Sequence, residues 1–182
     1  MAAGMSLATG EMASTRDPEL RQRLDQFLAG VEQQGYRLAL AQLRDRDEAL
    51  DAVQDAMFRL VRRYASKPSE QWKPLFFRIL INRVRDAQRR RPWITGLPAE
   101  MLERPAADDP EQQQAQRDAI TTLEIALGEL PARQREAVLL RVWEGFDVVT
   151  TATIMACSTG SVKTHLSRAL HRLRARVEEQ WE

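Results

Sequence analysis

The chain has 182 residues, and its 27 basic and 26 acidic side chains give a net charge of +1. A composition with 43% hydrophobic and 29% charged residues is typical of a globular protein, and the sequence lacks the roughly 20-residue apolar run of a membrane span. A single cysteine and two histidines are too few for an internal disulfide or a structural zinc site, so we expect no metal, no cofactor and a cytoplasmic location.

The near-zero net charge hides a strong asymmetry along the chain. Residues 1–91 carry 17 basic and 12 acidic side chains, whereas residues 92–118 carry 2 and 6. Two stretches are markedly basic: 78–91 holds six arginines against one aspartate, and 158–177 holds one lysine and four arginines without an acid. Local clusters of this kind, more than the total charge, decide whether a polyanion binds.

The first half predicts three helices behind a disordered tail of small residues, 1–16. Asp17-Pro18 is typical of a helix start, and an apolar stripe follows it at spacings of four, three and four. A second helix is expected at about 47–65, and a third at about 75–91, ended by Pro92. The apolar faces expected for these helices are Leu20, Leu24, Phe27 and Val31; Leu50, Val53, Met57, Leu60 and Tyr64; and Phe76, Leu80, Val84 and Ala87.

Residues 92–118 contain four prolines, six acids and a glutamine run, which predict a flexible acidic linker. Beyond it, an apolar stripe (Ile120, Leu123, Leu127 and Leu130) predicts another helix, and Pro131 opens the next one, which ends near Trp143–Gly145. A short helix is expected from Asp147 to Met155, and Ser158 caps a long one. The sequence therefore predicts an all-α chain of two small helical domains, of which the C-terminal one contains a helix-turn-helix.

The basic stretch after Ser158 predicts the DNA-reading helix of that motif. Such a helix lies in the major groove and uses residues near its N-terminus on base edges. The alternative is a solvated basic helix on an ordinary helical bundle. The exposed positions expected to bind DNA are Ser161, Lys163, Thr164, Ser167, Arg168 and Arg172.

The helix at 75–91 carries a second basic face. Arg78, Asn82, Arg85 and Arg89 recur at spacings of four, three and four, opposite the apolar face, and suit a phosphate backbone or base edges. Trp72 lies just before them, and aromatic side chains in basic grooves stack on unpaired bases. The alternative for this tryptophan is that it anchors its loop on the core.

On the helix at 47–65, a phenylalanine stands in a polar stripe formed by Asp51, Asp55, Phe58 and Arg62. An apolar ring in such a stripe indicates a protein-binding surface, unless the helix is buried on two sides. No catalytic constellation is present in the sequence.

Four segments, taken in order, resemble a known family. They are DAVQDAMFRL from Asp51; FRILIN from Phe77, followed by Asp86 and three arginines; and LPARQRE from Leu130 with CSTGSVK from Cys157. Over residues 20–91 and 119–178 the chain resembles the extracytoplasmic-function (ECF) RNA polymerase sigma factors of the sigma-70 family. The resemblance implies that 17–91 is sigma region 2, 92–118 a linker, and 119–182 sigma region 4.

In that family such a chain is an alternative sigma factor, which directs polymerase core to promoters and helps to open the −10 DNA. Catalysis stays with the polymerase, so the resemblance implies that the chain is not an enzyme. The resemblance implies contacts with the clamp of the largest polymerase subunit, the flap of the second largest, duplex and single-stranded promoter DNA, and an anti-sigma protein. By position, Asp51, Gln54, Asp55 and Phe58 would bind polymerase; Trp72, Arg78, Asn82, Arg85, Asp86 and Arg89 would bind the −10 strand; and Ser161, Lys163, Thr164, Ser167, Arg168 and Arg172 would bind the −35 duplex.

The chain departs from the family at two places: Thr151 stands where a core aliphatic residue is expected, and Leu75 replaces a tryptophan. VKTHL from Val162 also resembles the DNA-binding domain of response-regulator-type transcription factors, which bind duplex DNA without being polymerase subunits. Those proteins usually carry an α/β domain in front, and the first half shows no such alternation. A polymerase adaptor or antagonist is a third alternative, but it would not need two basic surfaces.

Overall fold

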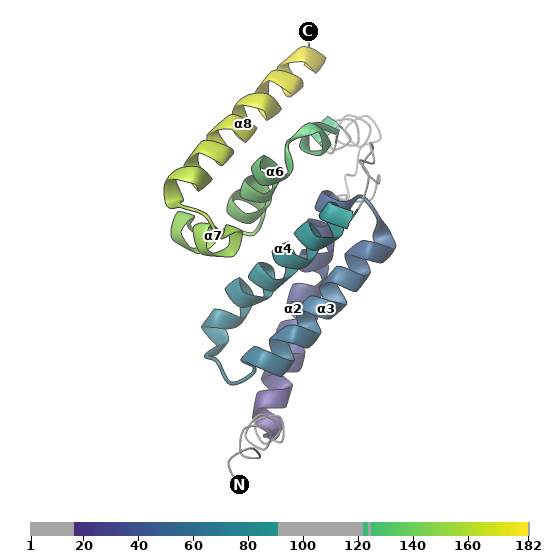
Figure 1. The fold of residues 1–182 in the computed structure, drawn as a ribbon, viewed down its shortest axis with the longest axis vertical. Helices are drawn as coiled ribbons and strands as arrows, with labels where there is room; N and C mark the ends of the chain where they lie inside the picture. The colour runs from purple at the N-terminus through teal and green to yellow at the C-terminus, as the bar shows by residue number, and fades with distance from the viewer. Residues whose placement is uncertain (1–16, 91–121, 124, 182) are drawn as a thin grey trace, which may run out of the picture.

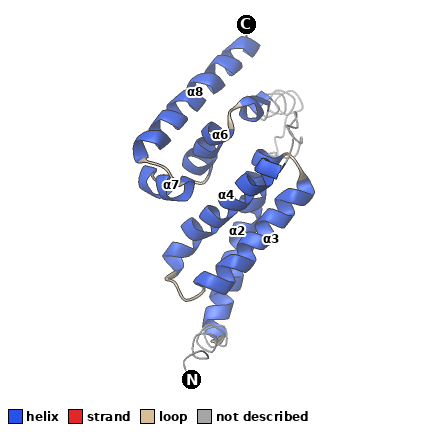
Figure 2. Cartoon of the chain, viewed as in Figure 1, coloured by secondary structure: helices blue, strands red, loops and turns tan. Residues whose placement is uncertain are grey.

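The computed structural model describes residues 17–90, 122–123 and 125–181, and within these ranges every regular element is a helix (Figures 1 and 2). The all-α prediction is confirmed for this part of the chain. The predicted tail (1–16) and the whole of the predicted linker (92–118) lie outside it. Among the helices described, none has the length and apolar character needed to cross a membrane.

Helix α2 (Pro18–Leu43) begins where the sequence predicted, because Asp17 and Pro18 suit the first turn. The Asp17 side chain accepts a hydrogen bond from the Glu19 backbone N–H at 3.0 Å, and a proline at the first position needs no donor. Further along, Gly35 lets α2 approach another helix closely, since a Cβ there would meet the Phe76 ring at 2.7 Å.

Helix α3 (Arg46–Tyr64) and helix α4 (Trp72–Arg90) pack on α2 to complete the first group of helices. A 3₁₀ turn, η2 (Ser69–Gln71), leads directly into α4, which therefore starts three residues earlier than predicted. Pro74 lies in the first turn of α4, where a missing N–H costs nothing. The predicted apolar face of α4 is confirmed, because Phe76, Leu80 and Val84 are fully buried.

The predicted inner face of α3 is partly wrong. Leu50 is 45% exposed, and small residues take much of the contact with the other helices. The apolar pattern allowed two overlapping stripes, and the one with smaller side chains faces the core because it lets the helices approach. The buried residues of α3 are Ala49, Ala52, Val53, Ala56 and Leu60.

The second group contains three helical runs. Helix α6 (Ala132–Val138) continues directly into a π-helical turn, η3 (Leu139–Trp143). It is followed by α7 (Val148–Met155) and α8 (Thr159–Trp181). Gly145, at φ +73°, ends the first of these helical runs close to the predicted position. The Asp147 carboxylate accepts from the Thr150 N–H at 2.6 Å and caps α7. The predicted short helix and the long one after it are confirmed.

The two groups lie against each other, with α4 alongside α7 (Figure 1). The ring of Phe77 on α4 meets that of Phe146 edge to face, at 5.4 Å between centroids. Lys73 reaches across to Glu144, with Nζ 3.2 Å from Oε2. An apolar contact bordered by an ion pair therefore holds the N-terminal half of α4 to the second group.

A buried arginine makes a further connection. Arg135 donates to the carbonyl oxygens of Leu127, Gly128 and Leu130 at 2.7–2.8 Å, and to that of Ala41 at the end of α2 at 3.0 Å. Burial, reinforced by the charge of Arg44, lowers the pKa of Arg135 to about 10, so the guanidinium remains charged at neutral pH. Arg135 thus satisfies carbonyls at a helix end and ties both groups together.

Candidate nucleic-acid interface

The C-terminal surface is built by α7, a tight turn and α8. Ala156 adopts the left-handed conformation at φ 52°, and the Cys157 N–H bonds the Ala152 carbonyl at 3.0 Å. The Ser158 hydroxyl then accepts from the Ser161 N–H at 3.0 Å and caps α8. Two helices joined in this way, with the second one basic, form the predicted helix-turn-helix.

Helix α8 is oriented by Val162 and Ala169, which are fully buried against its neighbours. Its predicted DNA-binding side chains therefore face outward. Ser161 is half-buried, and the hydroxyl of Thr164 bonds the Gly160 carbonyl at 3.0 Å, so these two are partly engaged within the helix. The exposed predicted residues are Lys163, Thr164, Ser167, Arg168 and Arg172.

The basic face of α4 is divided. Arg78, Asn82 and Arg89 are exposed, as the spacing predicted, and Arg89 forms an ion pair with Asp86 one turn earlier. Their exposure lets a phosphate backbone reach them over much of the helix, although Arg89 would have to share or leave Asp86. Arg85 belongs to the same stripe but is held by the second group of helices.

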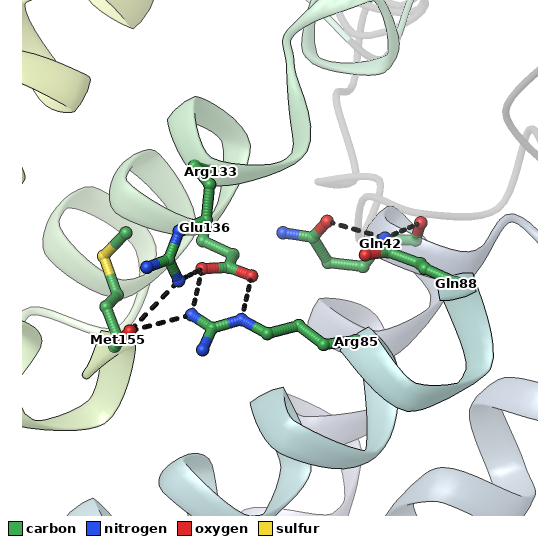
Figure 3. Close-up of polar contacts among 6 residues, drawn as sticks. All are labelled: Gln42, Arg85, Gln88, Arg133, Glu136 and Met155. Atoms are coloured by element: carbon green, nitrogen blue, oxygen red, sulfur yellow. Dashed lines mark hydrogen bonds and ion pairs between the residues drawn. The ribbon is translucent and has the colours of Figure 1, made fainter. Parts of the chain in front are cut away.

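Arg85 makes a two-bond contact with the Glu136 carboxylate of α6 (Figure 3). Its Nε donates to Oε1 at 2.9 Å, and its Nη2 to Oε2 at 2.6 Å and to the Met155 carbonyl at 3.0 Å. Arg133 also donates to Glu136 Oε2 and to Met155 O, at 3.0 Å each. Burial raises the pKa of Glu136, and the charge and hydrogen bonds of Arg85 oppose that rise.

We assigned no role to Glu136 from the sequence. Its spacing from Arg133 indicates an ion pair along one helix, but no sequence signal pairs it with Arg85, which lies 51 residues earlier. Another hydrogen bond near the C-terminal end of α4 joins it to α2. The side-chain amide of Gln88 donates to the main-chain oxygen of Gln42 at 3.0 Å (Figure 3).

Trp72 is 2% exposed in this structure. Its ring lies 5.6 Å from that of Phe27, and the Arg23 guanidinium covers it at 5.6 Å from the centroid. This burial favours the alternative in which Trp72 anchors the loop before α4. A cavity of about 410 Å³ opens beside that loop, between Leu20, Arg23, Lys67 and Trp72.

The polar face of α3 carries an exposed aromatic ring. Phe58 is 78% exposed, which excludes the alternative of a helix buried on two sides. Asp51 and Gln54 are exposed beside it. Asp55 is half-buried and forms ion pairs with Arg59 at 3.3 Å and with Arg83 of α4, so it also joins two helices. Among the described residues, no cluster of His, Cys, Asp or Glu is placed to hold a metal ion.

Known proteins with similar sequences all come from one family. Residues 122–173 match the family "Sigma-70, region 4". The chain is 30% identical to RNA polymerase sigma factor SigV of Bacillus subtilis over 146 residues, which cover 80% of this chain and 85% of SigV. It is 32% identical to ECF RNA polymerase sigma factor SigM of Mycobacterium tuberculosis over 158 residues, covering 84% and 76%.

ECF RNA polymerase sigma factor SigD of M. tuberculosis is 39% identical over 101 residues. The match covers 48% of SigD, so the chain spans about half the length of that relative.

Two solved structures share the fold. The sigma factor RpoE in complex with the anti-sigma factor NepR, from Bartonella quintana, matches with a TM-score of 0.67 and 24% identity over 88% of this chain and 97% of that one. CnrH in complex with the cytosolic domain of CnrY matches with a TM-score of 0.62 and 19% identity, over 93% and 95%.

Proposed function

The chain belongs to the extracytoplasmic-function group of RNA polymerase sigma factors, and we propose that it acts as an alternative sigma factor. In this role it binds polymerase core, directs it to promoters through their −10 and −35 elements, and helps to open the −10 DNA. The family consists of transcription initiation factors, not enzymes. The division follows from the resemblance: region 2 at 17–91, a linker at 92–118 and region 4 at 119–182.

One observation carries this proposal: α4 and α8 each expose a face of basic and polar side chains, on two separate groups of helices. The arginine and asparagine side chains of α4 suit the flexible backbone and base edges of a single strand. The capped start and basic face of α8 suit the major groove of a duplex. A factor that reads two promoter elements in different states needs both.

The proposed partners follow from the same surfaces. Phe58 with Asp51 and Gln54 forms the face for the polymerase clamp, and region 4 contacts the flap. Because one of the two similar structures is a complex with an anti-sigma factor, we also propose an anti-sigma partner for this chain. The cavity beside the loop at 65–72 is the site that we propose for a base turned out of the stack. The protein acts in the cytoplasm, where it meets polymerase and promoter DNA.

The experiment is run-off transcription with purified polymerase core on a mixed promoter library. Transcripts that require this chain support the proposal and reveal both promoter elements. Duplex binding without core association or transcripts would instead favour a response-regulator-type factor.

On a promoter found in this way, Arg78→Ala with Asn82→Ala tests the single-strand role of α4. We expect the double variant to reduce permanganate-detected opening at −10 more than it reduces binding to the closed duplex. The matched control is Arg21→Ala with Gln26→Ala, which likewise removes one arginine and one side-chain amide, here from exposed positions on α2. An equal loss of opening and duplex binding would contradict the assignment of α4 to the single strand.

A further inference from the structure

A side chain of α2 reaches across to the loop before α4. Arg23 lies 46 residues before Ser69, and its Nη2 donates to the Ser69 hydroxyl oxygen at 2.9 Å. The Ser69 hydroxyl in turn donates to the Glu70 carboxylate at 3.2 Å. Ser69 opens the 3₁₀ turn η2, which runs directly into α4. The arginine therefore ties the segment that leads into α4 to a neighbouring helix.

The same guanidinium also covers the ring of Trp72. Its central carbon lies 5.6 Å from the ring centroid, and the ring of Phe27 on α2 lies 5.6 Å away between centroids. Among the residues that the structure describes, none accepts a hydrogen bond from the buried indole N–H of Trp72. The position of this ring is therefore set by packing, to which Arg23 contributes a cation–π contact.

The backbone hydrogen bonds of the loop do not attach it to α2. The Lys67 N–H bonds the Tyr64 carbonyl at 3.0 Å, and the Gln71 N–H bonds the Pro68 carbonyl at 2.9 Å, so both bonds lie within the segment. They determine the local shape of the loop. Its placement against α2 depends on side chains, and Arg23 supplies both a hydrogen bond and a ring contact.

These contacts lie at the wall of the cavity of about 410 Å³ beside the loop. Leu20 and Arg23 line it from α2, Lys67 lines it from the loop, and Trp72 lines it from the start of α4. Pockets for small ligands hold roughly 300–1,000 Å³, so the volume suits a single base. Because separate segments of the chain form its sides, the width of the cavity depends on how firmly the loop is held to α2.

We propose that Arg23 is a positioning residue for −10 recognition: by bonding Ser69 and covering Trp72, it holds the loop before α4 in the shape that receives a base turned out of the stack. This inference rests on the base site proposed for the cavity. A site that is already formed spends less binding energy on ordering its loop, so the strand binds more tightly. Arg23 acts through the loop, and not by touching the base itself.

The test is an abasic scan of the −10 strand. Labelled single strands carry the −10 element found by run-off transcription, with one position abasic at a time, and the affinity of the holoenzyme for each strand is measured. For the wild type, we expect one position whose base contributes most to affinity. Arg23→Ala should reduce that contribution several-fold and leave the other positions unchanged, whereas general damage to the fold would weaken all strands alike. Arg21→Ala removes another exposed arginine of α2 and is the matched control.

Ser69→Ala separates positioning from direct contact with DNA. It removes the acceptor of the Arg23 hydrogen bond and leaves the guanidinium in place. If Arg23 acts through the loop, Ser69→Ala gives part of the same loss, and the double variant loses less than the sum of the two single variants. If Ser69→Ala has no effect, or if the two losses add in full, the proposal is overturned.

A second measurement needs no DNA. In a chain with Trp93→Phe, Trp143→Phe and Trp181→Phe, Trp72 is the remaining tryptophan. Within this background we expect Arg23→Ala to increase acrylamide quenching of the Trp72 fluorescence several-fold. Arg23→Lys, which keeps the charge but not the planar group, should increase it less. Equal quenching with and without Arg23 would show that the guanidinium does not hold the ring, and would overturn the proposal.

The abasic scan also separates this proposal from the one it rests on. If no position of the strand has a dominant base in the wild type, the cavity is not a base site, and the positioning role of Arg23 fails with it. If such a position exists but Arg23→Ala leaves its contribution unchanged, the base site stands and the role of Arg23 is wrong.

Discussion

A buried hydroxyl on α7 shows how one side chain weakens an otherwise apolar contact. Thr151 is fully buried, and its Oγ1 has no hydrogen-bond partner in the structure. An unsatisfied buried polar group destabilises a fold by about 1–3 kcal/mol. The sequence had already marked this position, since the family carries an aliphatic residue there, and burial of the side chain gives the physical reason for that preference.

We expect Thr151→Val to raise the free energy of unfolding by ~1 kcal/mol, since valine keeps the shape and removes the stranded hydroxyl. For a chain of this size, that corresponds to a Tm about 2–4 °C higher, measured by thermal unfolding. Thr153→Val is the control, because Thr153 is exposed on the same helix and its hydroxyl bonds the Val149 carbonyl. A lower Tm for Thr151→Val would show that a polar partner reaches this hydroxyl.

Helix ends were predictable because the signals are local. Asp17, Asp147 and Ser158 each bind a nearby backbone N–H, and the sequence marked all three. The inner face of α3 was less predictable, since Leu50 and the alanines beside it fit overlapping stripes. The π-helical turn at Leu139–Trp143, in which the Glu144 N–H bonds the Leu139 carbonyl at 2.9 Å, left no mark in the sequence.

The exposed face of α3 yields a prediction for polymerase binding. Phe58→Ala should weaken binding to polymerase core by ~2 kcal/mol, about thirtyfold in Kd, if the ring is a central anchor. A pull-down titration measures this, and Tm should hardly change because the ring is exposed. Leu50→Ala, an exposed apolar truncation on the same helix, is the control. Asp55 is a poor target because its ion pair with Arg83 joins α3 to α4, so its loss would disturb both.

The basic face of α8 yields a prediction about how DNA affinity depends on salt concentration. Lys163→Ala with Arg168→Ala should lower affinity for a duplex carrying the −35 element, and the slope of log K against log salt should shrink by about 1 per lost phosphate contact. Arg21→Ala with Arg63→Ala removes two exposed charges outside both proposed DNA faces and serves as the charge-matched control. An unchanged slope would remove both side chains from the interface.

At the scale of the whole molecule, the packing of the two groups of helices against each other could not be predicted from the sequence. The stripe on α4 predicted four equivalent outward side chains, yet Arg85 is turned to a carboxylate 51 residues away. Nothing in the spacing of α4 distinguishes it from Arg78 or Arg89, because the difference lies in the surface that packs against it. Trp72 is similar: its sequence context fits both an anchoring side chain and one that stacks on a base, whereas its contacts with Phe27 and Arg23 favour the anchor.

The contact between the two groups of helices also makes the stability of the chain depend on pH, because it buries Glu136. Burial raises the pKa of this carboxyl, so at pH values between the unfolded and folded pKa the folded chain holds a proton that the unfolded chain has released. Its stabilising contribution is therefore complete below the ordinary glutamate value of about 4.3, and it is lost as the pH rises through the folded pKa. Glu136→Gln does not titrate at this position and serves as the reference.

We therefore expect the free energy of unfolding of the wild type, relative to Glu136→Gln, to fall as the pH rises from about 4 toward neutral. Denaturant unfolding at a series of pH values measures the difference, and Glu129→Gln, made in parallel, corrects for the loss of one carboxylate elsewhere. A relative stability that rises with pH would mean that Arg85 and Arg133 outweigh burial. In that case the ion pairs of Arg85 and Arg133 with Glu136 would contribute to the contact between the two groups of helices, and added salt would weaken that contribution.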